Sequence, residues 1–307
     1  MRIGILSNSL NIPTGLADLV RQVADAELEG FESFWLPQGF GADVLTVISL
    51  AAQKTERIEL GTAVVPTLPH HPMVLAQQAL TVQEATGGRF TLGVGFSHKS
   101  SMEDGLGLSY DQPARHMKEY LSVLRSLVDY GCVDFDGAVY RVCGNLQQPD
   151  ARPFPILLGA LGPMMLRIAG ELADGTITWM CGRRTIETHI VPRIDAVAEQ
   201  AGRPKPRVCV GVPVAVTDEP ERARRRAASL FQHYAHMPNY RRMLDIEGVE
   251  GPAEIIIAGD EAQVEKQLRD LANAGATDLL AMILPVGGLA ASPERTRALL
   301  LSLIGKI

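Results

Sequence analysis

The residues with the clearest chemical potential stand at the end of a short strand-like segment. Residues 89–98 read RFTLGVGFSH, in which a buried-strand pattern gives way to glycines and then to the polar pair Ser97-His98. Gly93 and Gly95 would let another group approach the backbone closely, so this strand end suits a flat ligand lying against the chain. A strand that simply ends in a tight turn is the alternative. Similar strand ends elsewhere in the chain favour the ligand site.

The other predicted strand ends are also small and apolar. They contain no pair of carboxylates, and the adjacent His70 and His71 are more typical of capping or surface residues than of metal ligands. A large planar apolar ligand suits this inventory better than hydrolytic or metal chemistry. The six strand ends are Ser7-Asn8-Ser9, Pro37-Gln38-Gly39-Phe40, Ala63-Val64-Val65-Pro66-Thr67, Gly95-Phe96-Ser97-His98, Gly159-Ala160-Leu161-Gly162-Pro163 and Trp179-Met180-Cys181-Gly182-Arg183-Arg184.

Two of these ends could hold an anionic part of the ligand. Residues 159–163 lead directly into a predicted helix, whose first backbone N–H groups can bind a phosphate, and Pro163 is well tolerated in a first helical turn. An ordinary loop between strand and helix is the alternative. Arg183 and Arg184 could contact an acidic cofactor tail, although solvated loop charges have the same pattern.

The periodicity of the chain supplies the elements that must position these residues. Strand-like runs alternate with helical patterns, which favours parallel βα units. Eight such units in 307 residues predict an α/β fold of the (β/α)8 TIM-barrel type, a single domain over residues 1–307 with a small hairpin insertion at about 131–149, after the fourth unit. A doubly wound sheet would need a phosphate-binding first turn, yet residues 7–13 contain no glycine. The predicted strands are 2–7, 32–37, 57–65, 90–95, 156–158, 175–180, 208–216 and 278–284.

Helical patterns occupy most of the connections. Thr14 is the expected N-cap of the first helix and Gly30 the residue that ends it. Residues 99–108 are expected to form a polar loop that acts as a lid, and residues 238–258 an irregular to helical stretch. The predicted helices are 16–29, 44–54, 72–86, 112–130, 163–172, 186–200, 219–234, 261–274 and 293–303.

Composition and charge narrow the class of protein. Hydrophobic residues make up 46% of the chain and charged residues 21%, as in a globular protein with a large core. The net charge of −6 argues against a nucleic-acid partner, and no apolar run is long enough for a membrane span. The four cysteines form no CxxC pair, and the N-terminus begins as a strand without a signal-peptide pattern, so we expect a cytoplasmic protein.

Taken together, these segments resemble the bacterial luciferase-like monooxygenase superfamily, in particular its branch of oxidoreductases that depend on the deazaflavin coenzyme F420. The likeness covers residues 1 to about 215 and returns at 275–278. Any one segment alone is unspecific, whereas the set is specific. The matching segments are Gly30-Phe31 with Phe34-Trp35, 60–66 (LGTAVVP), His71-Pro72 with Ala76-Gln77-Gln78, 88–95 (GRFTLGVG), 159–163 (GALGP) and 173–179 (ADGTITW).

The resemblance implies how the site is arranged. Family members are barrels with one insertion, usually homodimers, that bind a cofactor ring across the strand ends and act on small molecules. The ring rests on a bulge in the third strand, here Ala63-Val64, where the family often has a non-prolyl cis peptide bond. Residues 159–162 match the phosphate-binding turn. The expected cofactor-binding residues are Ser7, Gln38, Ala63, Val64, Gly95, Phe96, Ser97, Gly159, Ala160, Leu161, Gly162 and Arg183.

Two positions depart from the family pattern. After the second strand many members carry an acidic residue and a histidine, where this chain has Gln38 and Gly39. After the fourth strand, members that oxidise sugar phosphates carry a glutamate, where this chain has His98. A sugar-phosphate substrate is therefore disfavoured, and His98 becomes the candidate catalytic proton donor or acceptor, because imidazole titrates near neutral pH. A loop histidine that only shapes the pocket is the alternative.

The resemblance thus implies a coenzyme F420-dependent oxidoreductase that transfers a hydride between the deazaflavin and a small, largely apolar organic substrate. An FMN-dependent luciferase-like monooxygenase is the first alternative. A non-catalytic protein that binds the deazaflavin or a flavin is the second, and Gln38-Gly39 keep it open. We expect a homodimer with a small-molecule substrate, and no metal, nucleic-acid or membrane partner.

Overall fold

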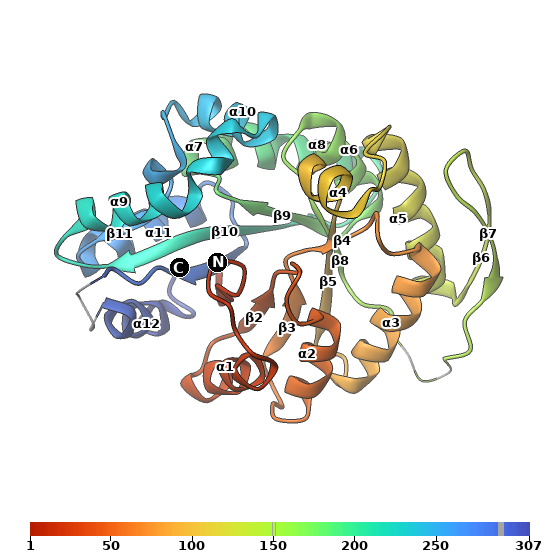
Figure 1. Cartoon of the computed structure of the whole chain (residues 1–307), viewed down its shortest axis with the longest axis horizontal. Helices are drawn as coiled ribbons and strands as arrows, with labels where there is room; N and C mark the ends of the chain where they lie inside the picture. Colours follow the sequence, from red (N-terminus) through yellow and green to blue (C-terminus); the bar gives the residue numbers. More distant parts are fainter. Residues whose placement is uncertain (149, 151, 288–291) are drawn as a thin grey trace.

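A closed barrel of parallel strands forms the centre of the structure, a computed structural model that describes all residues except 149, 151 and 288–291. Strand β10 pairs in parallel with both β9 and β12, which closes the ring of strands. The predicted TIM-barrel fold is therefore confirmed (Figure 1). Around the barrel the strands are β12 (Asp278–Ile283), β1 (Arg2–Leu6), β2 (Ser33–Leu36), β3 (Glu59–Thr62), β5 (Phe90–Gly95), β8 (Ile156–Gly159), β9 (Gly175–Trp179) and β10 (Arg207–Val216).

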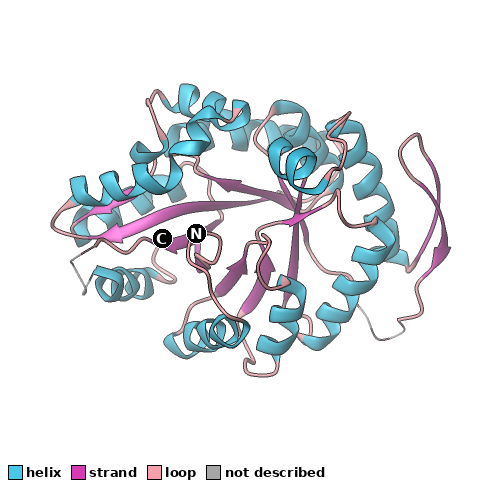
Figure 2. Ribbon diagram, viewed as in Figure 1, coloured by secondary structure: helices cyan, strands magenta, loops and turns pink. Residues whose placement is uncertain are grey.

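Helices surround the strands, as Figure 2 shows. They bury one apolar face each: in α5, for example, Met117, Leu121 and Leu124 are fully buried. Among the described residues, no helix is long and apolar enough to cross a membrane. The helices are α1 (Leu16–Glu29), α2 (Val44–Ala52), α3 (Pro72–Ala85), α4 (Lys99–Leu106), α5 (Pro113–Tyr130), α6 (Pro163–Leu172), α7 (Arg183–Thr185), η1 (Ile186–Ile190), α8 (Val191–Gln200), α9 (Pro220–Phe231), η2 (Gln232–His236), α10 (Pro238–Glu247), η3 (Pro252–Glu254), α11 (Glu261–Asn273) and α12 (Ser292–Leu303).

The predicted hairpin insertion is present as β6 (Cys132–Asp136) and β7 (Arg141–Asn145), which project from the side of the barrel (Figure 1). Its turn is held by Glu119 of α5, whose carboxylate accepts hydrogen bonds from the N–H groups of Ala138, Val139 and Tyr140. Pro149, where the predicted insertion ends, lies outside the described residues.

Two local predictions were wrong, and a third was right except at its end. Residues 99–108, predicted as a loop, contain the helix α4, whose one buried residue is Met102. Thr14 does not cap α1, because its hydroxyl donates to the Ile12 carbonyl and Gly15 is the N-cap. The stretch 238–258 is irregular to helical as predicted, with α10 and η3, except that its last two residues begin a strand, β11 (Ile257–Gly259), which pairs with the end of β10.

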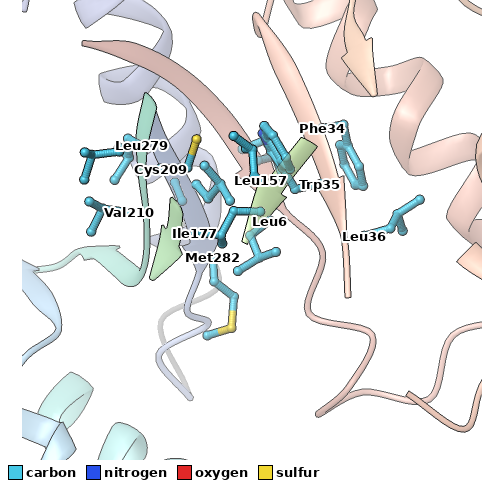
Figure 3. Packing of buried hydrophobic residues seen from close by; sticks show 14 of the residues in the cluster. Leu6, Phe34, Trp35, Leu36, Leu157, Ile177, Cys209, Val210, Leu279 and Met282 are labelled. Atoms are coloured by element: carbon cyan, nitrogen blue, oxygen red, sulfur yellow. The ribbon is translucent and has the colours of Figure 1, made fainter. Parts of the chain in front are cut away.

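The barrel interior is packed. The strand register places Leu6 beside Trp35 and Trp35 beside Gly61. The fully buried Trp35 indole lies over Gly61, where a Cβ would overlap the ring, so glycine is what makes room for tryptophan. Figure 3 shows Trp35, Leu6 and Ile177 converging in the interior. A packed interior leaves only the ends of the barrel for a ligand.

Charged side chains close the N-terminal end of the barrel. Arg207 bonds Asp278 at 2.6 Å and Glu59 at 2.8 Å, and Arg2 also pairs with Glu59. Burial alone would raise the pKa of Glu59 and Asp278, but the guanidinium groups hold both pKa values below their usual range. The carboxyl ends of the strands are therefore the end at which a ligand can bind.

Candidate cofactor and substrate site

The break between β3 and β4 (Val65–Pro66) lies at the mouth of the barrel. Ala63 and Val64 are joined by a cis peptide bond, which confirms the expectation for this position. The Val64 methyl groups lie against two glycines: a Cβ on Gly95 would be 2.7 Å from Cγ2, and one on Gly159 would be 3.6 Å from Cγ1. The bare backbone of β5 and β8 thus makes room for the half-buried Val64, whose apolar side chain offers a platform suited to a flat ligand.

The chain turns sharply after β5. Phe96 is buried, and Ser97 has a φ of +66°, a left-handed conformation that residues other than glycine rarely adopt. The Tyr110 hydroxyl donates a hydrogen bond of 2.8 Å to the Ser97 carbonyl oxygen, and the Tyr110 ring centroid lies 4.5 Å from that of Phe96. These contacts hold the turn that places His98 at the N-cap of α4.

His98 lies half-buried among aromatic rings. Its ring centroid is 5.9 Å from that of Tyr240 and 6.2 Å from that of Tyr234. Burial lowers the pKa of His98, and the neighbouring His233 lowers it further, so the imidazole is neutral at neutral pH. The side chain makes no capping hydrogen bond to α4, which leaves its nitrogens to a ligand. A neutral imidazole so placed can take or give a proton.

An aromatic wall beside His98 was not identified from the sequence. The ring centroids of Tyr234 and Tyr240 lie 4.6 Å apart, and Trp179, at the end of β9, packs at 5.8 Å against Phe231. In the described part of the chain, the buried Nε1 of Trp179 has no hydrogen-bond partner. Only Trp179 carried a signal in the sequence, because it stands at a strand end, whereas the two tyrosines come from η2 and α10.

The residues that follow β1 and β2 differ in whether their polar groups are free to bind a ligand. Ser7 follows β1, and its buried Oγ finds no hydrogen-bond partner among the described residues. Gln38 uses both ends of its amide: Nε2 donates to the Gly39 carbonyl at 2.7 Å, and Oε1 accepts from the Val44 N–H at 2.9 Å. Ser7 therefore offers a hydroxyl to a ligand, while Gln38 holds the start of α2 and its contact with a cofactor stays a prediction.

The turn after β8 leads into an uncapped helix. Gly162 provides no side-chain cap for α6 and Pro163 has no N–H group, so the N–H groups of Met164 and Met165 are the ones that can bind an anion. Arg242 Nη1 lies 3.8 Å from where a Cβ on Gly162 would be. Ala160 is buried, and the Leu161 carbonyl is fixed by His189 Nε2 at 2.8 Å. Free donors and a guanidinium group make this turn suitable for a phosphate.

At the second predicted anion site, Arg183 and Arg184, the donors are already bonded to carboxylates of the protein. Arg183 pairs with Glu187 at 2.7 Å. The Glu247 carboxylate accepts hydrogen bonds from the N–H groups of Arg184 at 3.1 Å and Thr185 at 2.7 Å, at the start of α7. Because a carboxylate occupies these donors, a phosphate fits the start of α6 better than that of α7. A cofactor contact from Arg183 stays a prediction.

The residues present fit a planar cofactor with a phosphate-bearing tail. Val64 offers the platform, the start of α6 with Arg242 offers the anion site, and Ser7 Oγ and Trp179 Nε1 are buried polar groups that a ligand can satisfy. A parallel barrel with its binding features at the carboxyl ends of the strands is the architecture of the (β/α)8 enzymes. The model of the luciferase-like monooxygenase family matches residues 1–278, and the chain belongs to this family.

Several curated proteins are similar to this chain over most of their length. The chain is 28% identical over 236 residues to the 5,10-methylenetetrahydromethanopterin reductase of Methanolobus tindarius, covering 76% of this chain and 72% of the relative. It is 29% identical over 269 residues to the F420-dependent glucose-6-phosphate dehydrogenase of Nakamurella multipartita, covering 83% and 77%. The fold matches the coenzyme F420-dependent tetrahydromethanopterin reductase of Methanopyrus kandleri with a TM-score of 0.77 at 20% identity, covering 100% of this chain and 98% of that one.

Proposed function

We propose that this protein is a coenzyme F420-dependent oxidoreductase that transfers a hydride between the deazaflavin and a small, largely apolar organic substrate. The observation that carries the proposal is the platform at Val64, backed by Gly95 and Gly159. The relative from Nakamurella multipartita, named as an F420-dependent enzyme, supports the choice of cofactor. Luciferase-like family membership supports the choice of reaction class.

The protein binds the cofactor, orients the substrate against it and transfers a proton to or from the substrate. F420 supplies the hydride chemistry when bound. Val64 and the bare backbone of Gly95 support a flat ring, and the start of α6 with Arg242 holds a phosphate. The imidazole of His98, neutral through burial, gives or takes the proton that accompanies hydride transfer at the substrate.

The family match also favours a second candidate, an FMN-dependent monooxygenase. The two are separated by incubating the full chain with oxidised F420 and a panel of small apolar alcohols, or with reduced F420 and the corresponding ketones, and following deazaflavin absorbance without oxygen. We expect substrate-dependent change in one of these panels. Substrate-dependent oxygen uptake with reduced FMN, and no change with F420, would move the protein to the monooxygenase class.

The protein is also proposed to act as a homodimer in the cytoplasm. Leu28 and Leu50 are exposed near the C-terminal ends of the neighbouring helices α1 and α2, which supports a contact between copies. Cys132 and Cys143 are exposed free thiols, which suits a reducing compartment. Light scattering of the purified chain tests the dimer, and a mass of one chain at micromolar concentration would contradict it.

A further inference from the structure

Exposed apolar side chains lie on the segments that follow three barrel strands, β1, β2 and β5, with β3 between the last two. Leu10, in the loop after β1, is 56% exposed, Phe40, after β2, is 78% exposed, and Leu106, at the end of α4 after β5, is 41% exposed. One exposed leucine needs no explanation, because much of any protein surface is apolar. Several on segments that meet beside a binding site are a different case.

The three segments meet at two glycines, Gly39 and Gly105, and we call Leu10, Phe40 and Leu106 together with these glycines the mouth strip. Leu10 Cδ2 lies over Gly39, 2.5 Å from where a Cβ would be, and Phe40 Cζ lies over Gly105 at 3.8 Å from its corresponding position. Leu106 is the next residue along α4. Because glycine has no side chain, Leu10 and Phe40 can lie directly on the backbone of Gly39 and Gly105, and these contacts bring the three segments together.

The mouth strip is continuous with the candidate site, because each of its segments extends a strand end that lines the site. Ser7 lies at the start of the loop with Leu10, Gln38 lies at the start of the loop with Phe40, and His98 is the N-cap of α4. The Asn11 side chain reaches the Met282 sulfur at 4.0 Å, so the first loop lies over the end of β12.

The segments of the strip offer no unpaired cation, and Asp104, next to Gly105, is an exposed carboxylate. On α4, Lys99 pairs with Glu103 at 3.6 Å. Gln38, the polar residue closest to Phe40 in the chain, has both ends of its amide bonded within the protein. Nothing in these segments thus offers an unpaired cation to an anionic substrate.

We infer that the mouth strip is the outer wall of the substrate site and takes the non-polar body of an uncharged organic substrate whose reacting carbon lies toward His98. The placement of the reacting carbon toward His98 depends on the proposed function, in which His98 transfers a proton to or from the substrate. Burying each additional methylene of such a substrate should tighten binding about two- to fourfold.

The test is a homologous series of 2-alkanones, from 2-butanone to 2-decanone, titrated by calorimetry into the full chain saturated with oxidised F420. We expect Kd to fall about two- to fourfold per methylene in the wild type. Phe40→Ser and Leu10→Ser should flatten the series. Tyr130→Ser is the matched control, because Tyr130 is 79% exposed at the end of α5, outside the strip. A flat series in the wild type, or an unchanged slope in both strip variants, would overturn the inference.

Two further readouts separate the other outcomes. F420 is titrated into the same preparations: if the wild type fails to bind it, the proposed function is contradicted, and a chain-length slope that disappears in the strip variants would still support the strip. If Phe40→Ser halves the molecular mass in light scattering while the slope stays, the strip is a contact between copies and the inference is wrong.

Discussion

The Tyr110 hydroxyl donates a hydrogen bond of 2.8 Å to the carbonyl oxygen of Ser97, the residue whose left-handed backbone turns the chain toward His98. Burial raises the pKa of Tyr110, so the hydroxyl remains a donor across the whole neutral range. Tyr110 touches the turn and not the proposed proton-transfer atoms, so its role is to position His98.

Tyr110→Phe keeps the ring against Phe96 and removes only the hydrogen bond. We expect kcat to fall about fivefold, the equivalent of about 1 kcal/mol, with little change in KM or in F420 affinity. Tyr130→Phe, on an exposed ring, is the control. Equal kcat values for the wild type and Tyr110→Phe would show that the hydrogen bond does not position the site.

His98→Gln tests the proposed proton carrier. We expect kcat to fall about a hundredfold or more while F420 affinity stays within about twofold. Because burial lowers the pKa of His98 from its usual 6.5, the acidic limb of the wild-type kcat profile should lie below pH 6.5 and disappear in the variant. The exposed His236, replaced by glutamine, is the control. A variant that keeps the wild-type rate and acidic limb would leave His98 with a structural role.

Gly95→Ala tests the platform. The new Cβ would lie 2.7 Å from Val64 Cγ2, so Val64 must move. We expect a loss of about 1–3 kcal/mol in the free energy of unfolding and about tenfold weaker F420 binding, measured by urea unfolding and fluorescence titration. Gly41→Ala is the matched control, because nothing lies within 4 Å of its Cβ position. Unchanged F420 affinity in Gly95→Ala would place the ring elsewhere.

His116 should make stability depend on pH. It is buried, stacks on Tyr120 at 5.7 Å, and burial lowers its pKa from 6.5 to about 4. Between these values the unfolded chain binds more protons than the folded one, so the free energy of unfolding falls as the pH drops from 6.5 to 4 and is unaffected by this group above 6.5.

The free energy of unfolding is measured with urea at a series of pH values. Between neutral pH and about pH 4 it should fall by about 2 kcal/mol less in His116→Gln than in the wild type. Because the variant and the wild type are compared at each pH, the contributions of the other buried histidines to the pH dependence cancel. Parallel curves for the two proteins would contradict the prediction.

The barrel could be predicted from the sequence because each of its strands is a short apolar run between helical patterns, as in 90–95 before Ser97. Helix α4 could not, because its residues KSSMEDGL bury only Met102 and its start depends on the turn at Ser97. Strand β11 has three residues and forms only by pairing with the end of β10.

The candidate site was predictable where it lies on strand ends. Val64, Gly95 and the turn before α6 occupy positions that the order of strands fixes. Tyr234 and Tyr240 could not be found this way, because their packing against His98 depends on how η2 and α10 fold over the barrel. Gln38 was named by its position, and only the structure shows that its amide is bonded to Gly39 and Val44.

The most direct test of the central claim is an equilibrium titration of the purified full chain with oxidised coenzyme F420 and, separately, with FMN, followed by ligand and tryptophan fluorescence. The platform at Val64 and the anion site at the start of α6 predict saturable binding of one F420 per chain, at least about tenfold tighter than FMN. Tighter binding of FMN would assign the protein to the monooxygenase class, and failure to bind either ligand would contradict the cofactor site itself.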